Sequence, residues 1–323
     1  MTRSGLTERR VIEELSHIFK SPAPPEGIGD DCAVIRIGRQ QMLVSTDMLA
    51  DSTHFSHIMS NMEKGRMAAA VNLSDIAAMG GRPVAMVVSL GIPRYMSMRD
   101  ISDIARGINE RAVEFGARIV GGDTKSTQEL TISITVMGRK TGRLLLRSGA
   151  RAGQILAVTG TIGEAAAEYS RLERGEKPEK GSRLFKPEPR IEEGILLSKS
   201  GISSAAIDIT DGLALSAWYI SRASCVRLEI DEEAVPVARR LSGHGIGSTR
   251  QKEIAYYWGG DYELLFTAES REALGRVASR MKTPVTVIGS VCKGEGVYSR
   301  RGKKKALLEE RGYDAFTGKK IDS

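Results

Sequence analysis

The stretch Met67-Ala-Ala-Ala-Val-Asn-Leu-Ser-Asp-Ile-Ala-Ala-Met79 is an apolar, alanine-rich run that nevertheless carries an asparagine and an aspartate. Its composition predicts a buried helix from Glu63 to Met79. Asn72 and Asp75 are three residues apart, so they share one face of this helix. A carboxylate there loses hydration when the helix packs, which is costly unless a cation or hydrogen-bond donors compensate. Asp75 is therefore a candidate metal ligand. A helix cap or a solvated position is the alternative, which the continuation of the helix past Asp75 disfavours.

Further aspartates stand in short frames of glycine, serine or threonine, each beside an apolar run. The frames are Gly27-Ile-Gly-Asp-Asp31, Ser45-Thr-Asp47, Gly121-Gly-Asp123, Asp208-Ile-Thr-Asp-Gly212 and Gly259-Gly-Asp261. Magnesium takes oxygen ligands, keeps several waters and shares one or two carboxylates per ion with substrate phosphates. Each frame alone is typical of a turn or a helix cap, but their joint occurrence favours a site with several Mg²⁺ ions.

The local chemistry of three frames narrows the candidates. Adjacent aspartates that enter a strand point to opposite faces, and of Asp30 and Asp31 we favour Asp30 as the ligand. Glycines before Asp123 let backbone N–H groups approach a phosphate while the carboxylate holds the metal. The alternative is a purely structural role in a hairpin or strand corner. In the fourth frame, Thr210 or Asp211 could equally serve only as the cap of the following helix.

The order of predicted elements mixes strands and helices along the whole chain. Strands are expected at 33–37, 42–45, 83–91, 118–120, 131–138, 154–159, 203–209, 226–230, 263–267 and 285–288, and helices at 8–19, 63–79, 98–115, 189–199, 212–222 and 270–281. Residues 171–190 read as an exposed loop. A length of 323 residues favours two domains, which we place at 1–147 and 148–323. Asp47 is expected to follow its strand directly, as is the Gly121-Gly-Asp123 frame.

Composition and charge exclude several classes of protein. The net charge is +7 and the pI about 9.3, but aromatic residues make up only 5% and offer no stacking platform, so nucleic acid is not an expected partner. Three separated cysteines argue against a disulfide framework or a structural zinc site. No apolar stretch approaches the roughly 20 residues needed to span a bilayer, and the N-terminus lacks a signal peptide. We expect a cytoplasmic protein without membrane contact.

The familiar nucleotide-binding and nucleophile motifs are missing from the sequence. It contains no Walker A motif, no protein-kinase signature set and no GxGxxG before a long helix. None of the four histidines stands beside an evident serine or cysteine nucleophile, so no covalent catalytic residue is predicted. His54 and His57 follow Asp47 closely and are candidates for ligand contact.

With these frames in order, the chain resembles the thiamine-monophosphate kinases, members of the superfamily that includes aminoimidazole ribonucleotide synthetase and selenophosphate synthetase. The resemblance is nearly full length. It rests on GIGDDCAVI at 27–35, LVSTDMLADSTHF at 43–55, AAAVNLSDIAAMGGRP at 68–83, GGDTKS at 121–126, RSGARAGQILAVTG at 147–160, IDITDGL at 207–213, GGDYELLF at 259–266 and VTVIGSV at 285–291.

The resemblance implies an N-terminal α/β domain that pairs with its copy across a homodimer and closes a β-barrel, followed by a larger α+β domain. ATP would lie in the cleft between the domains and would phosphorylate thiamine monophosphate directly. By motif position, the implied Mg²⁺ ligands are Asp30, Ser45, Thr46, Asp47, Asp75, Asp123, Asp208 and Asp211, the ATP contacts Gly121, Gly122, Arg147 and Thr210, and the thiamine phosphate contacts His54 and Tyr313.

Two departures from the family pattern bear on substrate choice. Gly260 stands where similar members have a glutamate near the acceptor, and Ala105 stands where they often have a tyrosine beside the nucleotide. Gly260 makes a sister enzyme acting with ATP on another acceptor a credible alternative. A noncatalytic nucleotide or metal sensor is the alternative from a different class.

Overall fold

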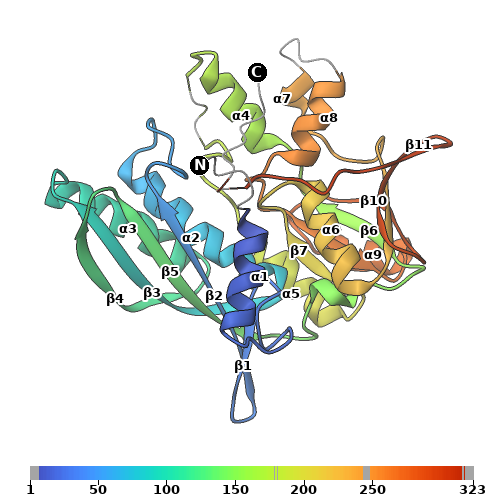
Figure 1. The fold of residues 1–323 in the computed structure, drawn as a ribbon, viewed down its shortest axis with the longest axis horizontal. Coiled ribbons are helices and arrows are strands. Elements are labelled where there is room, and N and C mark those ends of the chain that lie inside the picture. Colours follow the sequence, from blue (N-terminus) through green and yellow to red (C-terminus); the bar gives the residue numbers. More distant parts are fainter. Residues whose placement is uncertain (1–6, 178, 180, 243–247, 315, 317–323) are drawn as a thin grey trace.

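Two β-sheets, each packed with helices, lie side by side in the molecule (Figure 1). The computed structural model describes residues 7–177, 179, 181–242, 248–314 and 316. The first sheet has the order β1 (Ala33–Ile37), β2 (Gln40–Ala50), β5 (Thr131–Lys140), β3 (Gly81–Pro93), β4 (Arg118–Thr127). Strands β3 and β4 are parallel and are connected by the helix α3 (Met98–Glu114). The other strand pairs of this sheet are antiparallel.

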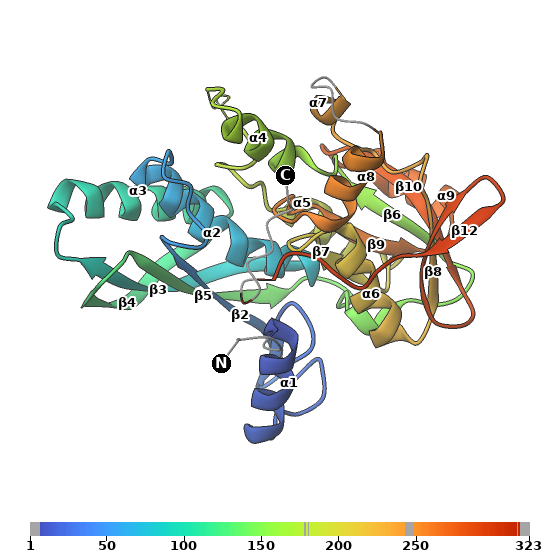
Figure 2. The ribbon, with the colours of Figure 1, turned by 45° about the horizontal axis from the view of Figure 1, so that its top comes forward.

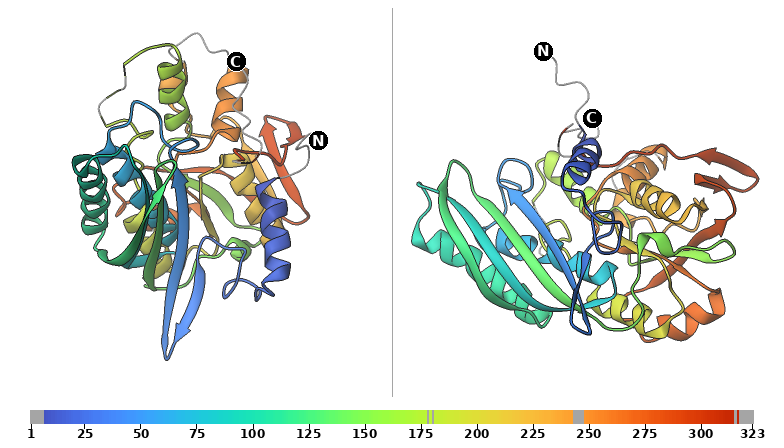
Figure 3. Two further views of the ribbon diagram at one scale, coloured as in Figure 1. Left: turned by 60° about the vertical axis from the view of Figure 1, so that its left-hand side comes forward. Right: turned by 60° about the horizontal axis from the view of Figure 1, so that its bottom comes forward.

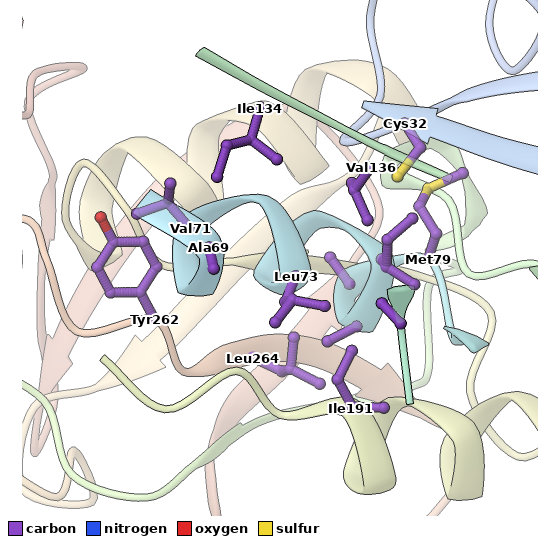
Figure 4. Close-up of a cluster of buried hydrophobic side chains, with 14 of the residues drawn as sticks. Cys32, Ala69, Val71, Leu73, Met79, Ile134, Val136, Ile191, Tyr262 and Leu264 are labelled. Carbon is purple, nitrogen blue, oxygen red and sulfur yellow. The ribbon is translucent and has the colours of Figure 1, made fainter. Parts of the chain in front are cut away.

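Helix α2 (Asn61–Ala78) is the central element of the fold. Its N-terminus is fixed by a capping box, in which the side chains of Ser60 and Glu63 each accept a backbone N–H of the other residue. A helix that is apolar on all sides must be buried on all sides. Accordingly, α2 packs with α3 on one face of the first sheet (Figure 2) and against the second domain on its other side. Figure 4 shows Leu73 of α2 beside Leu264, a strand residue of the second domain.

The second sheet has seven strands among the described residues. Its order is β12 (Lys304–Leu307), β11 (Gly296–Arg301), β8 (Arg227–Asp231), β10 (Val285–Cys292), β6 (Ile155–Thr159), β9 (Leu264–Ala268), β7 (Ala206–Asp208). The same part of the chain contains the helices α4 (Glu164–Glu173), α5 (Ile191–Ser200), α6 (Leu213–Ser224), α7 (Arg239–Ser242), α8 (Ser248–Tyr257) and α9 (Arg271–Ala278) (Figure 3). The mixed α/β and α+β architecture expected from the sequence is confirmed.

The first sheet is covered on one face only. Cross-strand partners in a sheet share a face, and the register places Met48, Ser133 and Ser89 in one row on the side away from α2 and α3. Among the described residues, no helix covers this side (Figure 2). Large apolar side chains stay exposed there, with Ile37 at 64% and Met48 at 65%.

Several predicted boundaries were wrong. Strands β2 and β4 continue through Asp47 and Asp123, because pairing with β5 and β3 extends each ladder past the apolar run. Helices α7 and α8 and strands β11 and β12 were not predicted. Residues 171–190 are not simply an exposed loop, since α4 reaches Glu173 and the side chains of Phe185 and Arg190 are buried.

Helix α1 (Glu8–Ile18) begins as the sequence predicts and stands against the C-terminal segment. Thr7 caps it through a bond from the N–H of Arg10, and the N–H of Glu8 donates to Asp314 at 3.2 Å. None of its described residues is buried. No described helix has both the length and the apolar character required to cross a bilayer.

Candidate active site

Carboxylates from both domains converge where α2 meets β2 and β7. The side chain of Asp47 faces α2 because its row partner Ile134 is fully buried on that side. The N–H of Asp47 donates to Asn72 Oδ1 at 3.1 Å, and Ser45 Oγ donates to Asp75 Oδ2 at 2.5 Å. The polar face predicted for α2 is therefore directed at β2.

The core of this centre is formed by Asp31, Asp75 and Asp208. One carboxylate oxygen from each lies within 4.8 Å of the others. Ser74, the neighbour of Asp75 on α2, donates to Asp208 Oδ2 at 2.5 Å and so links the two domains. We call Asp30, Asp31, Asp47, Asp75, Asp208 and Asp211 the carboxylate cluster, since each takes part in a charge–charge interaction with at least one other member.

Asp31 is the member that sequence reasoning passed over. Of the adjacent pair, Asp30 accepts the backbone N–H of Arg147 at 3.0 Å, whereas Asp31 enters the group with Asp75 and Asp208. The alternation of side chains along a strand separated the two residues but could not say which one pointed inwards. The sequence around the pair carries no signal that distinguishes the two aspartates.

Burial shifts the pKa of these carboxylates upwards. It raises the pKa of Asp75 well above its usual range, with Asp47 and Asp208 adding to the rise. Burial, with the charge of Asp31, raises the pKa of Asp208 to about 8, and burial raises that of Asp30 to about 7. The Oδ2 atom of Asp31 is buried without a hydrogen-bond partner among the described residues. Unpaired oxygens and mutually repelling charges are what a bound cation would satisfy, so the donor set fits Mg²⁺.

Arg147 is a cation inside this centre. Its Nη2 donates to Asp31 Oδ1 at 2.5 Å, and its guanidinium lies over the ring of Tyr219, 5.0 Å from the centroid. Its Nε is buried without a partner in the described structure. One arginine therefore offsets only part of the negative charge.

Two residues of the implied ligand set face away from the cluster. The hydroxyl of Thr46 donates to the carbonyl of Ile134 and accepts from Thr135, both at 3.1 Å. Asp123 is exposed on the uncovered face, and its hydrogen bond with Lys125 lowers its pKa. With two strands between β2 and β4, Asp123 lies about 14 Å from Asp47 within one chain.

A cavity lies between α3 and the strands β3 and β4. This cavity has a volume of about 410 Å³ and is lined by Ala105, Gly121 and Gly122 together with aliphatic side chains such as Val88 and Ile108. Gly122 is needed there, because a Cβ atom would come within 1.7 Å of the Val88 carbonyl oxygen. Of the four residues that the resemblance assigned to ATP, Gly121 and Gly122 line this cavity, whereas Arg147 and Thr210 do not; position 105 contributes no aromatic ring to it.

The residues implied to touch the acceptor lie on segments at the margin of the cluster. His54 lies in the loop after β2, where partial desolvation of the ring lowers its pKa and its Nδ1 accepts the N–H of Ala50 at 3.3 Å. The N–H of Tyr313 donates to the carbonyl of Asp211 at 3.1 Å. The N–H of Gly260 donates to the carbonyl of Thr210 at 2.7 Å, so the two frames are joined.

The two halves of the chain match two family models. Residues 29–140 match the AIR synthase related protein, N-terminal domain, and residues 151–301 match the AIR synthase related protein, C-terminal domain. Fold and site thus define an AIR synthase related protein. The thiamine-monophosphate kinase of Pyrococcus horikoshii is 36% identical over 94% of this chain and 96% of its own, and that of Archaeoglobus fulgidus is 33% identical over 98% and 100%. The chain belongs to the thiamine-monophosphate kinase family.

Solved structures agree with this membership. AaThiL complexed with AMPPCP and TMP has a TM-score of 0.85 and 28% identity, covering 97% of this chain and 98% of that one. The hydrogenase maturation protein HypE in complex with ATP has a TM-score of 0.71 at 19% identity, which shows the shared fold alone. The family predicted from the sequence is confirmed.

Proposed function

We propose that this protein transfers the γ-phosphoryl group of ATP to thiamine monophosphate and forms thiamine diphosphate and ADP. The observation that carries the proposal is the carboxylate cluster, with an unpartnered oxygen on Asp31, in a chain of the thiamine-monophosphate kinase family. Phosphoryl transfer needs positioned reactants and compensated charge more than it needs a nucleophilic side chain. The acceptor is itself an anionic phosphate, so transfer is direct and involves no phosphoenzyme.

Several Mg²⁺ ions are part of the proposal. When bound, they would offset the charge of the phosphates that must approach each other. The ligands we propose are the carboxylate cluster and Ser45, which is bonded to Asp75. For Thr46 and Asp123, which face away from the cluster, we propose a role that requires the dimer, in which the uncovered faces of two sheets meet.

Side chains around the cluster would hold the two substrates. We propose that the adenine base occupies the cavity lined by Gly121 and Gly122, with Thr210 near the phosphates. Arg147 can bind phosphate bidentately once it releases Asp31. His54 would contact the phosphate of thiamine monophosphate, and the ring of Tyr313, at 38% exposure, is available to stack on the acceptor.

The assembly and the location of the protein belong to the same proposal. We propose a cytoplasmic homodimer, formed through the uncovered face of the first sheet, with a domain boundary near residue 147. Support comes from the exposed apolar residues Ile37 and Met48 on that face, which a second copy would bury. Nucleic acid and membranes are not proposed as partners.

The proposal is tested by phosphorus NMR of the protein with MgATP and a panel of acceptors, with controls that lack acceptor or Mg²⁺. We expect thiamine diphosphate and ADP together, and only in the complete mixture. Turnover with a different phosphorylated acceptor would favour a sister enzyme, the alternative that Gly260 supports. ATP binding without any product would favour a sensor.

A further inference from the structure

A polar cavity of about 380 Å³ lies in the second domain, at the end of β6 and the starts of β9 and β10. Thr161, Arg183, Arg190, Asp261, Lys282 and Thr283 are among the residues that line it. None of the described residues that line it belongs to the carboxylate cluster or to the cavity beside Gly121. The frame Gly259-Gly-Asp261 thus contributes its aspartate here, and the proposed kinase reaction does not use this carboxylate.

Two groups of opposite character are left unpaired on this one cavity. Asp261 is only 4% exposed; its Oδ2 accepts the N–H of Gly163 at 2.8 Å, the backbone of Glu164 and Ala165 at the start of α4 also acts on this carboxylate, and its Oδ1 is buried without a hydrogen-bond partner of good geometry among the described residues. Arg183 also lines the cavity, and its Nη1 is buried without a partner in the same part of the chain. A buried polar group without a partner is costly, and here one acceptor and one donor are both unmet.

Some of the other charged residues that line the cavity form ion pairs with each other, and others do not. Arg190 and Glu263 form a buried ion pair with two hydrogen bonds, and Arg190 Nη1 also donates to Thr283 Oγ1 at 3.0 Å. That pair neutralises itself and gives the cavity a rigid wall. Glu179 pairs with Arg171 at 3.3 Å. Among the described residues, neither Lys282 nor the other lining carboxylate, Glu164, has an ion pair, so two cations and two carboxylates stay available.

We propose that this cavity is a second ligand site, separate from the phosphoryl-transfer site, for a small zwitterion that carries a phosphate or carboxylate at one end and an amine at the other. Its anionic end is recognised by Arg183 and Lys282, with hydroxyl donors from Thr161 and Thr283. Its ammonium end is recognised by Asp261, assisted by Glu164. Both unmet groups are satisfied only by a ligand with both ends, because a plain anion leaves Asp261 unpaired and a plain amine leaves Arg183 unpaired.

The test is isothermal titration of the full chain in EDTA without ATP. The two-ended probes are O-phosphoethanolamine and β-alanine, which separate phosphate from carboxylate recognition, and the one-ended probes are inorganic phosphate and ethanolamine. We expect one two-ended probe to bind at least about tenfold more tightly than either one-ended probe. Arg183→Gln and Lys282→Gln should each weaken that binding by about tenfold, whereas Lys303→Gln, which removes an exposed cation outside the cavity, should leave it unchanged.

Three results of this titration would overturn the proposal: no saturable binding of either two-ended probe, equal affinity for one-ended and two-ended probes, or unchanged affinity in Arg183→Gln. A second titration without EDTA would also overturn it if MgATP displaced the probe completely. The last result would place the probe in the phosphoryl-transfer site. Since binding is measured without turnover, failure of the kinase proposal and failure of this one are distinguishable.

Discussion

Gly260 stands where the resemblance to the family led us to expect a glutamate, and its backbone conformation favours glycine. It has φ +88°, a conformation that costs other residues energy because of their Cβ atom. A Cβ here would also lie 3.4 Å from the Cβ of Ala165. The local backbone therefore requires glycine, and a glutamate could not be restored at this position without strain.

Replacement of Gly260 by alanine should lower the free energy of unfolding by roughly 1 kcal/mol. The matched control is Gly275→Ala in α9, where a new Cβ meets nothing within 4 Å and the helix should gain up to about 1 kcal/mol. Urea denaturation of both variants gives the comparison. Equal effects of the two substitutions would contradict the backbone argument.

The carboxylates of the cluster predict how stability depends on pH without metal. Because burial raises the pKa of Asp208 to about 8 and that of Asp211 to about 7, the folded chain binds more protons than the unfolded chain above pH 4. Stability is then fully present near pH 4 and is lost as pH rises towards 8. In EDTA the melting temperature should fall from pH 5 to pH 8, and 10 mM MgCl₂, a concentration of roughly the usual assay order, should flatten the fall. Parallel curves with and without Mg²⁺ would remove the cluster as a cation site.

At the scale of single elements, α2 contributes residues to both the hydrophobic core and the carboxylate cluster. Its apolar, alanine-rich sequence predicted a helix with Asn72 and Asp75 on one face, and that prediction is confirmed because periodicity and capping are local properties. The lengths of β2 and β4 could not be predicted, since they depend on ladder partners far away in sequence. The same long-range pairing decides that Asp47 faces the cluster and Asp123 the opposite side.

Leu73 tests the role of α2 as the support of both domains. It is fully buried and packs in the cluster that includes Leu264 of the second domain. Leu73→Ala should cost about 3 kcal/mol of unfolding free energy, from lost burial and the cavity left behind. Val113→Ala on α3, where the side chain is 62% exposed, should change it by less than about 0.5 kcal/mol. Chemical denaturation with a tryptophan fluorescence readout measures both, and similar costs would show that α2 is not the central support.

At the scale of the molecule, the sequence predicted the family and the two-sheet class but not how the site is completed. Motifs in a fixed order identify a fold without specifying which face each side chain takes. The position of Asp31 beside Asp75 and Asp208, and the orientation of Thr46 and Asp123 away from the cluster, could be seen only in the assembled structure. Because Thr46 and Asp123 face away from the cluster, the role proposed for them requires the dimer.

Met48 provides the test of that dimer. Its side chain is 65% exposed on the uncovered face, so Met48→Glu would place a charge from each copy in the interface. We expect the dimer to weaken by about 2 kcal/mol, or roughly thirtyfold in dissociation constant. Sedimentation equilibrium would detect this shift, with Val113→Glu on the helix-covered side as the control. Dissociation that is equally strong in the control, or absent in Met48→Glu, would place the interface elsewhere.

The most direct test of the kinase proposal is the initial rate of thiamine diphosphate formation from MgATP and thiamine monophosphate, measured for the native chain and for Asp75→Asn. Asparagine keeps the size of the side chain but removes a charge at the centre of the carboxylate cluster. The account predicts Mg²⁺-dependent product with the native chain and a rate at least about a hundredfold lower for the variant, at unchanged circular dichroism. Thiamine diphosphate formed by Asp75→Asn at the native rate would contradict it.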